Sequence, residues 1–300
     1  LFAINLNAQT SDSLQVQNLL EVVIQAERKA LDYSSKTASK IPLKNIENPQ
    51  VLNTVNHLVI EQQGITNFPD ILRNIPGIGR NWSSVSPYYT SRGFTVRNYI
   101  RNGMISYAAS DMDPVNIEQV DVVKGPVGTL FGSGSVSFGG LINRVTKQPF
   151  EERKIAVGYQ FGSYDLSRFT ADVNLPLNKE KTALFRLNAS HTYDGSFQDA
   201  GFLKSTFIAP SLLYKVNERL TLSLDAEIYE REGTSQPQFS PVGPKQTGST
   251  ETWASTPEEL NIDYKKSFSN NSVKLKDPAR NFFGKIDYKL SDHWKMQTNI

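Results

Sequence analysis

The residues whose types and spacing could do chemistry are concentrated in a glycine-rich stretch, residues 121–149. Its six glycines fall at positions 125, 128, 132, 134, 139 and 140, and this density permits sharp turns and a close approach between backbones. Phosphate binding is the first chemistry to consider, but no Gly-Lys-Ser or Gly-Lys-Thr follows the glycines, as a phosphate loop requires. Residues 132–137, Gly-Ser-Gly-Ser-Val-Ser, also lack the third glycine of a dinucleotide-binding fingerprint. We therefore interpret the stretch as closely packed turns.

Catalytic and metal-binding chemistry is poorly represented elsewhere in the chain. The sequence contains no cysteine, which excludes thiol catalysis, disulfides and zinc fingers. The three histidines, at positions 57, 191 and 293, are far apart and form no nucleophile–base set. The formal net charge is only +2, and the 32 Lys and Arg residues are interspersed with 30 Asp and Glu residues, which is not the clustered basic pattern of a nucleic-acid-binding protein. The sequence thus predicts no enzyme, no metal site and no nucleic-acid partner.

The elements that must position any binding residues change character near residue 153. From there on, apolar and polar residues alternate with a period of two, which is typical of strands with one apolar face. About seven such strands are predicted, around residues 155–161, 168–175, 185–190, 205–216, 221–228, 284–290 and 294–300. A soluble antiparallel sheet shows the same alternation, but three features favour a membrane β-barrel. Full charges occupy the polar face at strand centres, aromatic residues lie near strand ends, and three short turns contrast with one long connection at residues 231–276.

Seven strands cannot close a barrel in lipid, because the open edges leave backbone donors and acceptors unpaired. A barrel wide enough to enclose a second domain needs about 22 strands, so we expect the sequence to be the N-terminal part of a longer chain. Residues 41–150 are predicted to form an α+β domain with one helix at residues 68–75, capped by Thr66 or Asn67. Residues 10–40 are predicted to be a flexible segment with a strand-like run at 20–26, and residues 1–9 look like the end of a secretory signal.

The motifs along the chain resemble those of TonB-dependent outer-membrane receptors of the siderophore-receptor type. The similarity runs through an Ile-Pro at 41–42, a Pro-Gly at 76–77, an Arg-Gly-Phe at 92–94, an Asn-Gly at 102–103 and an Asp-Pro at 113–114. It continues through residues 117–126 (Ile-Glu-Gln-Val-Asp-Val-Val-Lys-Gly-Pro) and residues 139–149 (Gly-Gly-Leu-Ile-Asn-Arg-Val-Thr-Lys-Gln-Pro). The resemblance implies an α+β plug domain, residues 41–150, followed by an antiparallel transmembrane β-barrel. Residues 151–300 would supply about 7 of its about 22 strands.

The resemblance also assigns two sets of residues within the N-terminal half. It implies structural roles in the plug for Arg92, Gly93, Glu118, Lys124, Gly125, Pro126, Gly132, Gly139 and Gly140. The family commonly has arginine where Lys124 stands, and lysine cannot clamp a carboxylate with two nitrogens, which weakens the expectation of a plug-to-barrel salt bridge at this position. The resemblance further implies a TonB box, an exposed strand that adds to the sheet edge of a periplasmic partner. The box would be formed by Glu21, Val22, Val23, Ile24, Gln25 and Ala26.

The resemblance finally implies a function and a binding site. The protein is expected to lie in the lipid of the bacterial outer membrane and to import ferric siderophores, with energy supplied by TonB and its proton-coupled inner-membrane complex. Iron would arrive as a siderophore chelate, with no cofactor bound directly. The side chains expected to face the chelate are Arg80, Trp82, Tyr88, Tyr89 and Tyr107. Import of another large nutrient, such as cobalamin or an oligosaccharide, and a passive porin or adhesin barrel stay open as alternatives.

Overall fold

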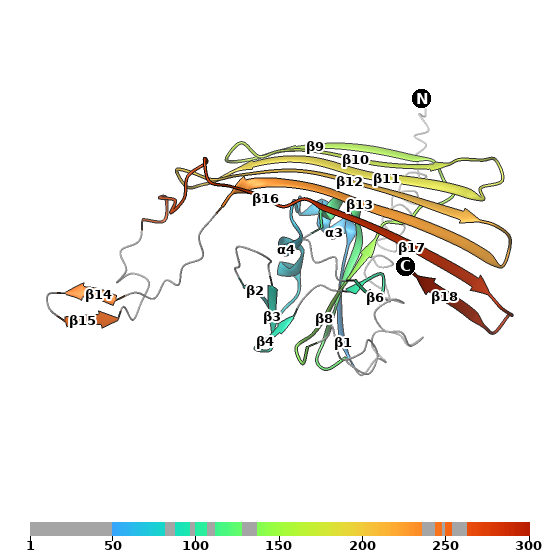
Figure 1. The fold of residues 1–300 in the computed structure, drawn as a ribbon, viewed down its shortest axis with the longest axis horizontal. Coiled ribbons are helices and arrows are strands. Elements are labelled where there is room, and N and C mark those ends of the chain that lie inside the picture. The colour runs from blue at the N-terminus through green and yellow to red at the C-terminus, as the bar shows by residue number, and fades with distance from the viewer. Residues whose placement is uncertain are drawn as a thin grey trace, which may run out of the picture.

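The computed structural model describes residues 50–81, 88–96, 100–106, 112–127, 137–235, 244–247, 250–253 and 263–300. These residues form two connected parts (Figure 1). An α+β part, which we call the inner unit, contains the elements from β1 to β8. A long antiparallel sheet, which we call the wall, contains β9 to β13 and β16 to β18. In Figure 1 the wall arches over the inner unit, and helices α3 and α4 lie on the side of the inner unit that is nearest to the wall.

The main sheet of the inner unit has five strands in the order β1-β7-β8-β5-β6. Their bounds are Val51–Asn56 (β1), Ile117–Lys124 (β7), Gly140–Thr146 (β8), Ile100–Arg101 (β5) and Met104–Ile105 (β6). Neighbouring strands are antiparallel except β5 and β8, which are parallel. Val120, Val122 and Val123 of β7 are all buried, because both faces of this strand are covered and a strand buried on both faces is a continuous apolar run.

Helix α3 (His57–Gln62) follows β1 directly. It begins there because the Asn56 side chain accepts a hydrogen bond from the Val59 backbone N–H at 3.1 Å and caps the helix. The prediction of only one helix in this part of the chain was therefore wrong. A helix of six residues is too short to reveal a helical period in the sequence.

The predicted helix at residues 68–75 is α4 (Phe68–Ile71) continued by the 3₁₀ turn η2 (Leu72–Asn74). Of the two expected caps, Asn67 is the one used, since its side chain accepts a hydrogen bond from the Asp70 backbone N–H at 3.1 Å. A second short 3₁₀ turn, η3 (Pro114–Asn116), leads into β7.

The core of the inner unit lies between the helices, the main sheet and a second sheet with the order β2-β3-β4. The bounds of this second sheet are Ile78–Asn81 (β2), Tyr88–Ser91 (β3) and Phe94–Val96 (β4). The core side chains are all buried; they include Val55, Ile60, Phe68, Ile71, Leu72, Tyr89, Val120 and Ile142. Their removal from water is the main force that holds these short elements together.

The wall has seven strands in the order β18-β17-β13-β12-β11-β10-β9, with the short β16 beside β13. The bounds are Lys154–Phe161 (β9), Ser167–Pro176 (β10), Ala183–Gly195 (β11), Phe202–Lys215 (β12), Leu220–Thr234 (β13), Lys274–Lys276 (β16), Ala279–Lys289 (β17) and Lys295–Asn299 (β18). All pairings in the wall are antiparallel. Strands β14 (Pro244–Thr247) and β15 (Thr250–Trp253) form a separate hairpin. The seven strands predicted from the alternating pattern are thus confirmed.

The two faces of the wall are reversed relative to a soluble sheet. Polar and charged side chains are buried on the face toward the inner unit, among them Arg168, Asp172, Asn174, Arg186, Asn188, Ser190 and Glu227. Apolar side chains are exposed on the other face, with Val157 70% exposed, Leu224 60% and Phe282 72%. A polar interior with an apolar exterior is the arrangement of transmembrane β-strands, and it disfavours the soluble alternative. Among the described residues, no helix has the length and apolar character needed to cross a membrane.

The connections between wall strands follow the prediction in part. The turns at residues 177–182, 216–219 and 290–294 are short and lie at one end of the wall. At the other end, residues 162–166 and 196–201 form equally short connections, whereas β13 and β17 are joined by the long segment that carries β14, β15 and β16. We call this the long-connection end of the wall.

Candidate functional site

The glycine-rich stretch contains the end of β7 and the whole of β8, which pair with each other. Gly125 and Gly140 have φ angles of +100° and +120°, which glycine adopts without strain. A Cβ atom on Gly140 would lie 1.9 Å from the carbonyl oxygen of Val123, and one on Gly139 would lie 2.8 Å from the carbonyl oxygen of Ser91. Side chains are therefore excluded at both positions, as expected for closely packed turns. Gly132 lies outside the described residues.

Two other expected plug residues, Arg92 and Gly93, form the turn between β3 and β4. Both have positive φ angles, 53° and 84°. Nearby, the Lys124 ammonium group donates a hydrogen bond to the carbonyl oxygen of Pro76, so this side chain binds within the inner unit. Partial burial, together with the positive charge of Arg92, lowers the pKa of Lys124. Pro126, which follows the hairpin strand β7, is exposed.

Glu118 ties β7 to helix α3. Its Oε1 lies 3.1 Å from Nδ1 of His57. The hydrogen-bonding imidazole of His57 lowers the pKa of Glu118 against the opposing effect of burial. His57, which the sequence offered as an isolated histidine, therefore has a structural role between two elements of the inner unit.

The interface between the inner unit and the wall contains three groups of buried ion pairs. The first group is centred on Arg101 of β5. Its Nε donates to Glu227 of β13 at 2.9 Å, and its Nη2 donates to Asp225 of the same strand at 3.3 Å. The guanidinium carbon also lies 3.9 Å from the centre of the Phe283 ring on β17, a favourable cation–π contact. Arg101 and Glu227 are both almost inaccessible to solvent.

The second group is centred on Asp113, just before η3. Arg168 of β10 holds its carboxylate with two nitrogens, at 2.9 and 2.5 Å, and the Ser190 hydroxyl donates to it at 2.7 Å. The same carboxylate accepts a hydrogen bond from the Val115 backbone N–H at 2.9 Å. One buried side chain thus fixes both the local turn and its attachment to the wall. The two-nitrogen geometry is the strong form of a charge-assisted hydrogen bond.

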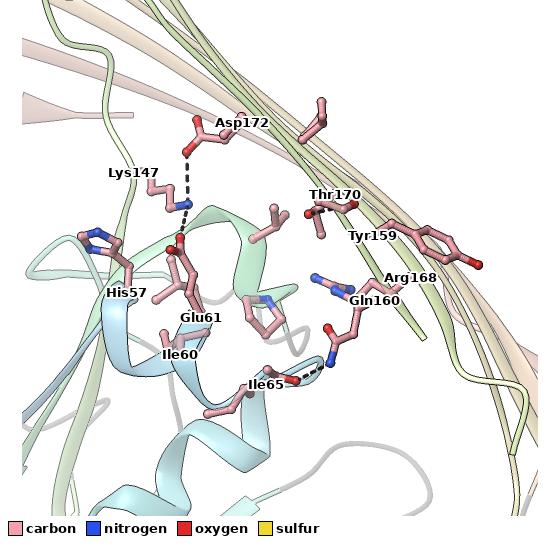
Figure 2. Close-up of a pocket in the computed structure, with 18 of the residues that line it drawn as sticks. His57, Ile60, Glu61, Ile65, Lys147, Tyr159, Gln160, Arg168, Thr170 and Asp172 are labelled. Atoms are coloured by element: carbon pink, nitrogen blue, oxygen red, sulfur yellow. Dashed lines mark hydrogen bonds and ion pairs between the residues drawn. The ribbon is translucent and has the colours of Figure 1, made fainter. Parts of the chain in front are cut away.

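The third group surrounds Asp172 of β10 (Figure 2). Lys147, just after β8, lies 3.2 Å from Asp172 and 3.8 Å from Glu61 of α3. Arg186 of β11 donates to Asp172 at 2.9 and 2.8 Å. Figure 2 shows Lys147 between the two carboxylates, at the side of a cavity of about 350 Å³. On the other side of this cavity, the Gln160 amide donates to the carbonyl oxygen of Gly64 at 2.9 Å.

These interface residues were not among the predicted site residues. The sequence did show charges at the centres of predicted strands, and Asp172 and Arg186 are such charges. The partners across the interface could not be identified from the sequence, because paired residues such as Arg101 and Glu227 are 126 positions apart. The Asp113 and Lys147 side chains belonged to recognised motifs, but no local pattern indicated that these side chains point toward the wall.

The residues that were predicted to face the ligand differ in their exposure to solvent. Arg80 is exposed on β2. Tyr89, which pairs with Arg80 across β2 and β3, has no exposed surface and packs against Phe68 with ring centres 6.3 Å apart. Its ring therefore belongs to the core and is a poor candidate for a ligand contact. Trp82, Tyr107, the side chain of Tyr88 and the expected TonB box, Glu21 to Ala26, lie outside the described residues.

Arg80 faces a small cavity between the inner unit and the wall. The cavity has a volume of about 160 Å³ and is lined from the inner unit by Arg80, Asn67 and Met112. From the wall it is lined by side chains near the ends of β11, β12 and β13, namely Thr192, Asp194, Leu203, Ser205, Tyr229 and Arg231. These strand ends belong to the long-connection end of the wall. Arg80 is therefore at the end of the molecule where the longest described connection begins.

Comparison with known proteins gives a consistent family. Residues 44–138 match the TonB-dependent Receptor Plug Domain. The chain is 27% identical over 274 residues to the ferripyoverdine receptor of Pseudomonas aeruginosa. This alignment covers 86% of this chain and 32% of that protein. It is 29% identical over 175 residues to the catecholate siderophore receptor Fiu of Escherichia coli K12. This second alignment covers 56% of this chain and 23% of that protein. The chain thus spans about a third of the length of the first of these relatives.

The fold is also similar to solved structures. The pyoverdine outer membrane receptor FpvA from Pseudomonas aeruginosa PAO1 bound to pyoverdine superposes with a TM-score of 0.74 at 24% identity, over 88% of this chain and 38% of that one. The ferric-catecholate import receptor Fiu from Escherichia coli K12 gives a TM-score of 0.71 at 21% identity, over 89% of this chain and 38% of that one. Both comparisons support the fold, an α+β domain beside an antiparallel wall.

Proposed function

The chain carries the plug domain of a TonB-dependent receptor followed by wall strands with the fold of these receptors, and from this premise we propose that the protein imports ferric siderophores across the bacterial outer membrane. The inner unit is the plug. The observation that carries the proposal is that the plug is attached by buried ion pairs to the polar face of a wall whose other face is apolar. Such a plug blocks a membrane-spanning barrel, so passage of a large ligand requires the plug to move.

The iron is cargo and arrives within its chelate. The long-connection end of the wall, where Arg80 lines a cavity, is the outward end, because outer-membrane barrels place their longer loops outside the cell. Guanidinium groups bind oxygen-rich, negatively charged ligands with two nitrogens. Arg80 is the described residue that best fits such a contact, and Trp82 and Tyr107 stay candidates from the sequence.

The contacts of the plug with the wall indicate which part of it moves. The second half of the plug, from β5 onward, is held through Arg101, Asp113 and Lys147. Breaking one buried ion pair by removing a partner costs about 3–5 kcal/mol. No ion pair joins the first half, β1 to β4, to the wall within the residues that the structure describes. The carbonyl oxygen of Gly64 in the first half accepts a neutral hydrogen bond from Gln160 of the wall.

The first half is instead attached to the second half. β1 pairs with β7 along six residues, and each backbone hydrogen bond contributes about 1 kcal/mol. A ladder that is pulled from its end opens one bond at a time, whereas a buried ion pair must be lost as a whole. The expected TonB box precedes β1, so a pull on it loads β1 first. We infer that TonB peels β1 and the helices away while the second half stays attached to the wall.

The function is tested by deleting residues 20–26 from the full-length receptor. Energised uptake of chelates labelled with radioactive iron should be lost, while equilibrium binding of the same chelates to whole cells should stay unchanged. Deletion of residues 30–36, seven residues that also precede β1, is the matched control and should retain uptake. Unchanged uptake after deletion of 20–26 would overturn energised import and favour a passive barrel.

A further inference from the structure

The cavity that Arg80 lines contains three charged side chains that have no ion-pair partner among the residues that the structure describes. Arg80 of β2, Asp194 of β11 and Arg231 of β13 all line it. None of the three forms an ion pair or a side-chain hydrogen bond with any other residue that the structure describes. Asp194 and Arg231 are half-buried and Arg80 is exposed.

In this respect Arg80 and Arg231 differ from the other arginines of the interface. Arg101, Arg168 and Arg186 each hold a carboxylate at a distance of 2.9 Å or less. Asp194 and Arg231 are half-buried, and removing a charge from water without a partner is costly. Charges that converge on one cavity, and are unpaired within the described part of the chain, are therefore suited to binding a charged group of a ligand.

The balance of charge around the cavity favours an anion. Among the described lining residues, the two guanidinium groups of Arg80 and Arg231 face one carboxylate, that of Asp194, which has no described partner. Asp113 also lines the cavity but is already neutralised, since Arg168 binds both of its oxygens. A guanidinium group matches the two oxygens of a carboxylate. Since the charge of Asp194 balances one of the two guanidinium groups, the cavity suits a ligand group with a single negative charge. Asp194 would repel a second negative charge.

The size of the cavity limits what can enter it. The volume of the cavity is about 160 Å³. Sites for drug-sized ligands have volumes of about 300–1,000 Å³. A whole ferric chelate is therefore too large, but a terminal carboxylate on a short arm fits.

We propose that this cavity is a subsite for a terminal carboxylate of the imported ferric chelate, held between Arg80 of the plug and Arg231 of the wall. The inference rests on the proposed function and narrows its ligand to chelates that carry a carboxylate-ended arm outside the iron-binding groups. Because one arginine comes from each part of the molecule, the bound arm bridges the plug and the wall.

The test uses probes that differ only at the end of one arm. Iron-loaded desferrioxamine B carrying an N-terminal succinyl group ends in a carboxylate, and the acetylated form ends in a neutral methyl group; the same two endings are placed on a tricatecholate core. Binding is measured by tryptophan fluorescence on the purified full-length receptor. The carboxylate-ended probe of at least one core should bind about tenfold or more tightly than its neutral counterpart, as expected for hydrogen bonds to a charged group.

Substitutions on the wall then locate the subsite. Arg231→Gln should reduce the preference for the carboxylate to less than about twofold, whereas Asp194→Asn should strengthen carboxylate binding by removing the repulsive charge. Arg219→Gln, in the turn before β13 at the opposite end of the wall, is the matched control and should keep the preference.

Equal binding of the two endings by the unaltered receptor, or an unchanged preference in both cavity variants, would overturn the subsite and leave siderophore import standing. Failure of all four probes to bind would overturn both.

Discussion

At the scale of residues, the plug is held by charges that are satisfied only across its boundary with the wall. Arg101 is the clearest case, because its partners Glu227 and Asp225 both belong to β13. Neither the plug nor the wall alone could bury its part of this group without leaving an unpaired charge. The interface therefore favours one position of the second half of the plug, and a shifted position is disfavoured by the cost of desolvated charge.

Replacing Arg101 with methionine tests this cost. The substitution should lower the free energy of unfolding of the plug by about 3–5 kcal/mol, because Glu227 stays buried without its cation. The double substitution Arg101→Met with Glu227→Leu should recover most of the loss, since apolar replacement of a whole buried pair is nearly neutral. Protection of the plug against proteolysis across a urea series measures both variants. Losses that simply add in the double variant would contradict the interpretation.

At the scale of elements, the antiparallel pair of β7 and β8 closes on a tight contact at Gly140. Gly140→Ala should prevent its closure and reduce the yield of folded receptor severely, because the new Cβ would lie 1.9 Å from the carbonyl oxygen of Val123 at a φ of +120°. Gly77→Ala is the matched control. Gly77 also has a positive φ, +74°, but nothing lies within 4 Å of its added Cβ, so we expect only the backbone strain of about 1–2 kcal/mol. Heat-modifiable migration on gels measures the folded fraction, and equal yields for the two variants would be inconsistent with steric exclusion at Gly140.

The elements also differ in how far the sequence could predict them. The wall strands were predictable because one side of each meets lipid and the other meets polar surroundings, which imposes a period of two along residues 154–299. Helix α3 was not predictable, since its start depends on the cap by Asn56 and its one buried residue is Ile60. Tyr89 was expected beside the ligand, but it is enclosed in the core between α4 and β3. In a strand of four residues, tertiary packing decides whether an aromatic side chain is buried or exposed, and no local sequence pattern indicates the outcome.

At the scale of the whole molecule, the central claim is that the first half of the plug must leave β7 during import. Val55 and Val120 are opposite each other on β1 and β7, and opposite residues of antiparallel strands have Cα atoms about 4.5–5.5 Å apart, within the range of a disulfide. Residues 1–300 contain no cysteine, so within this part of the receptor the two introduced cysteines can pair only with each other. Ala171 and Ala189, opposite each other within the wall, provide a control pair that joins strands which stay together.

The most direct measurement is uptake of iron-labelled chelate by cells that carry each cysteine pair, before and after reduction. With Val55→Cys and Val120→Cys oxidised, the receptor should bind chelate but import none, and a reducing agent should restore import. The oxidised Ala171→Cys and Ala189→Cys pair should import normally. Full uptake through a receptor in which β1 is covalently joined to β7 would contradict the account.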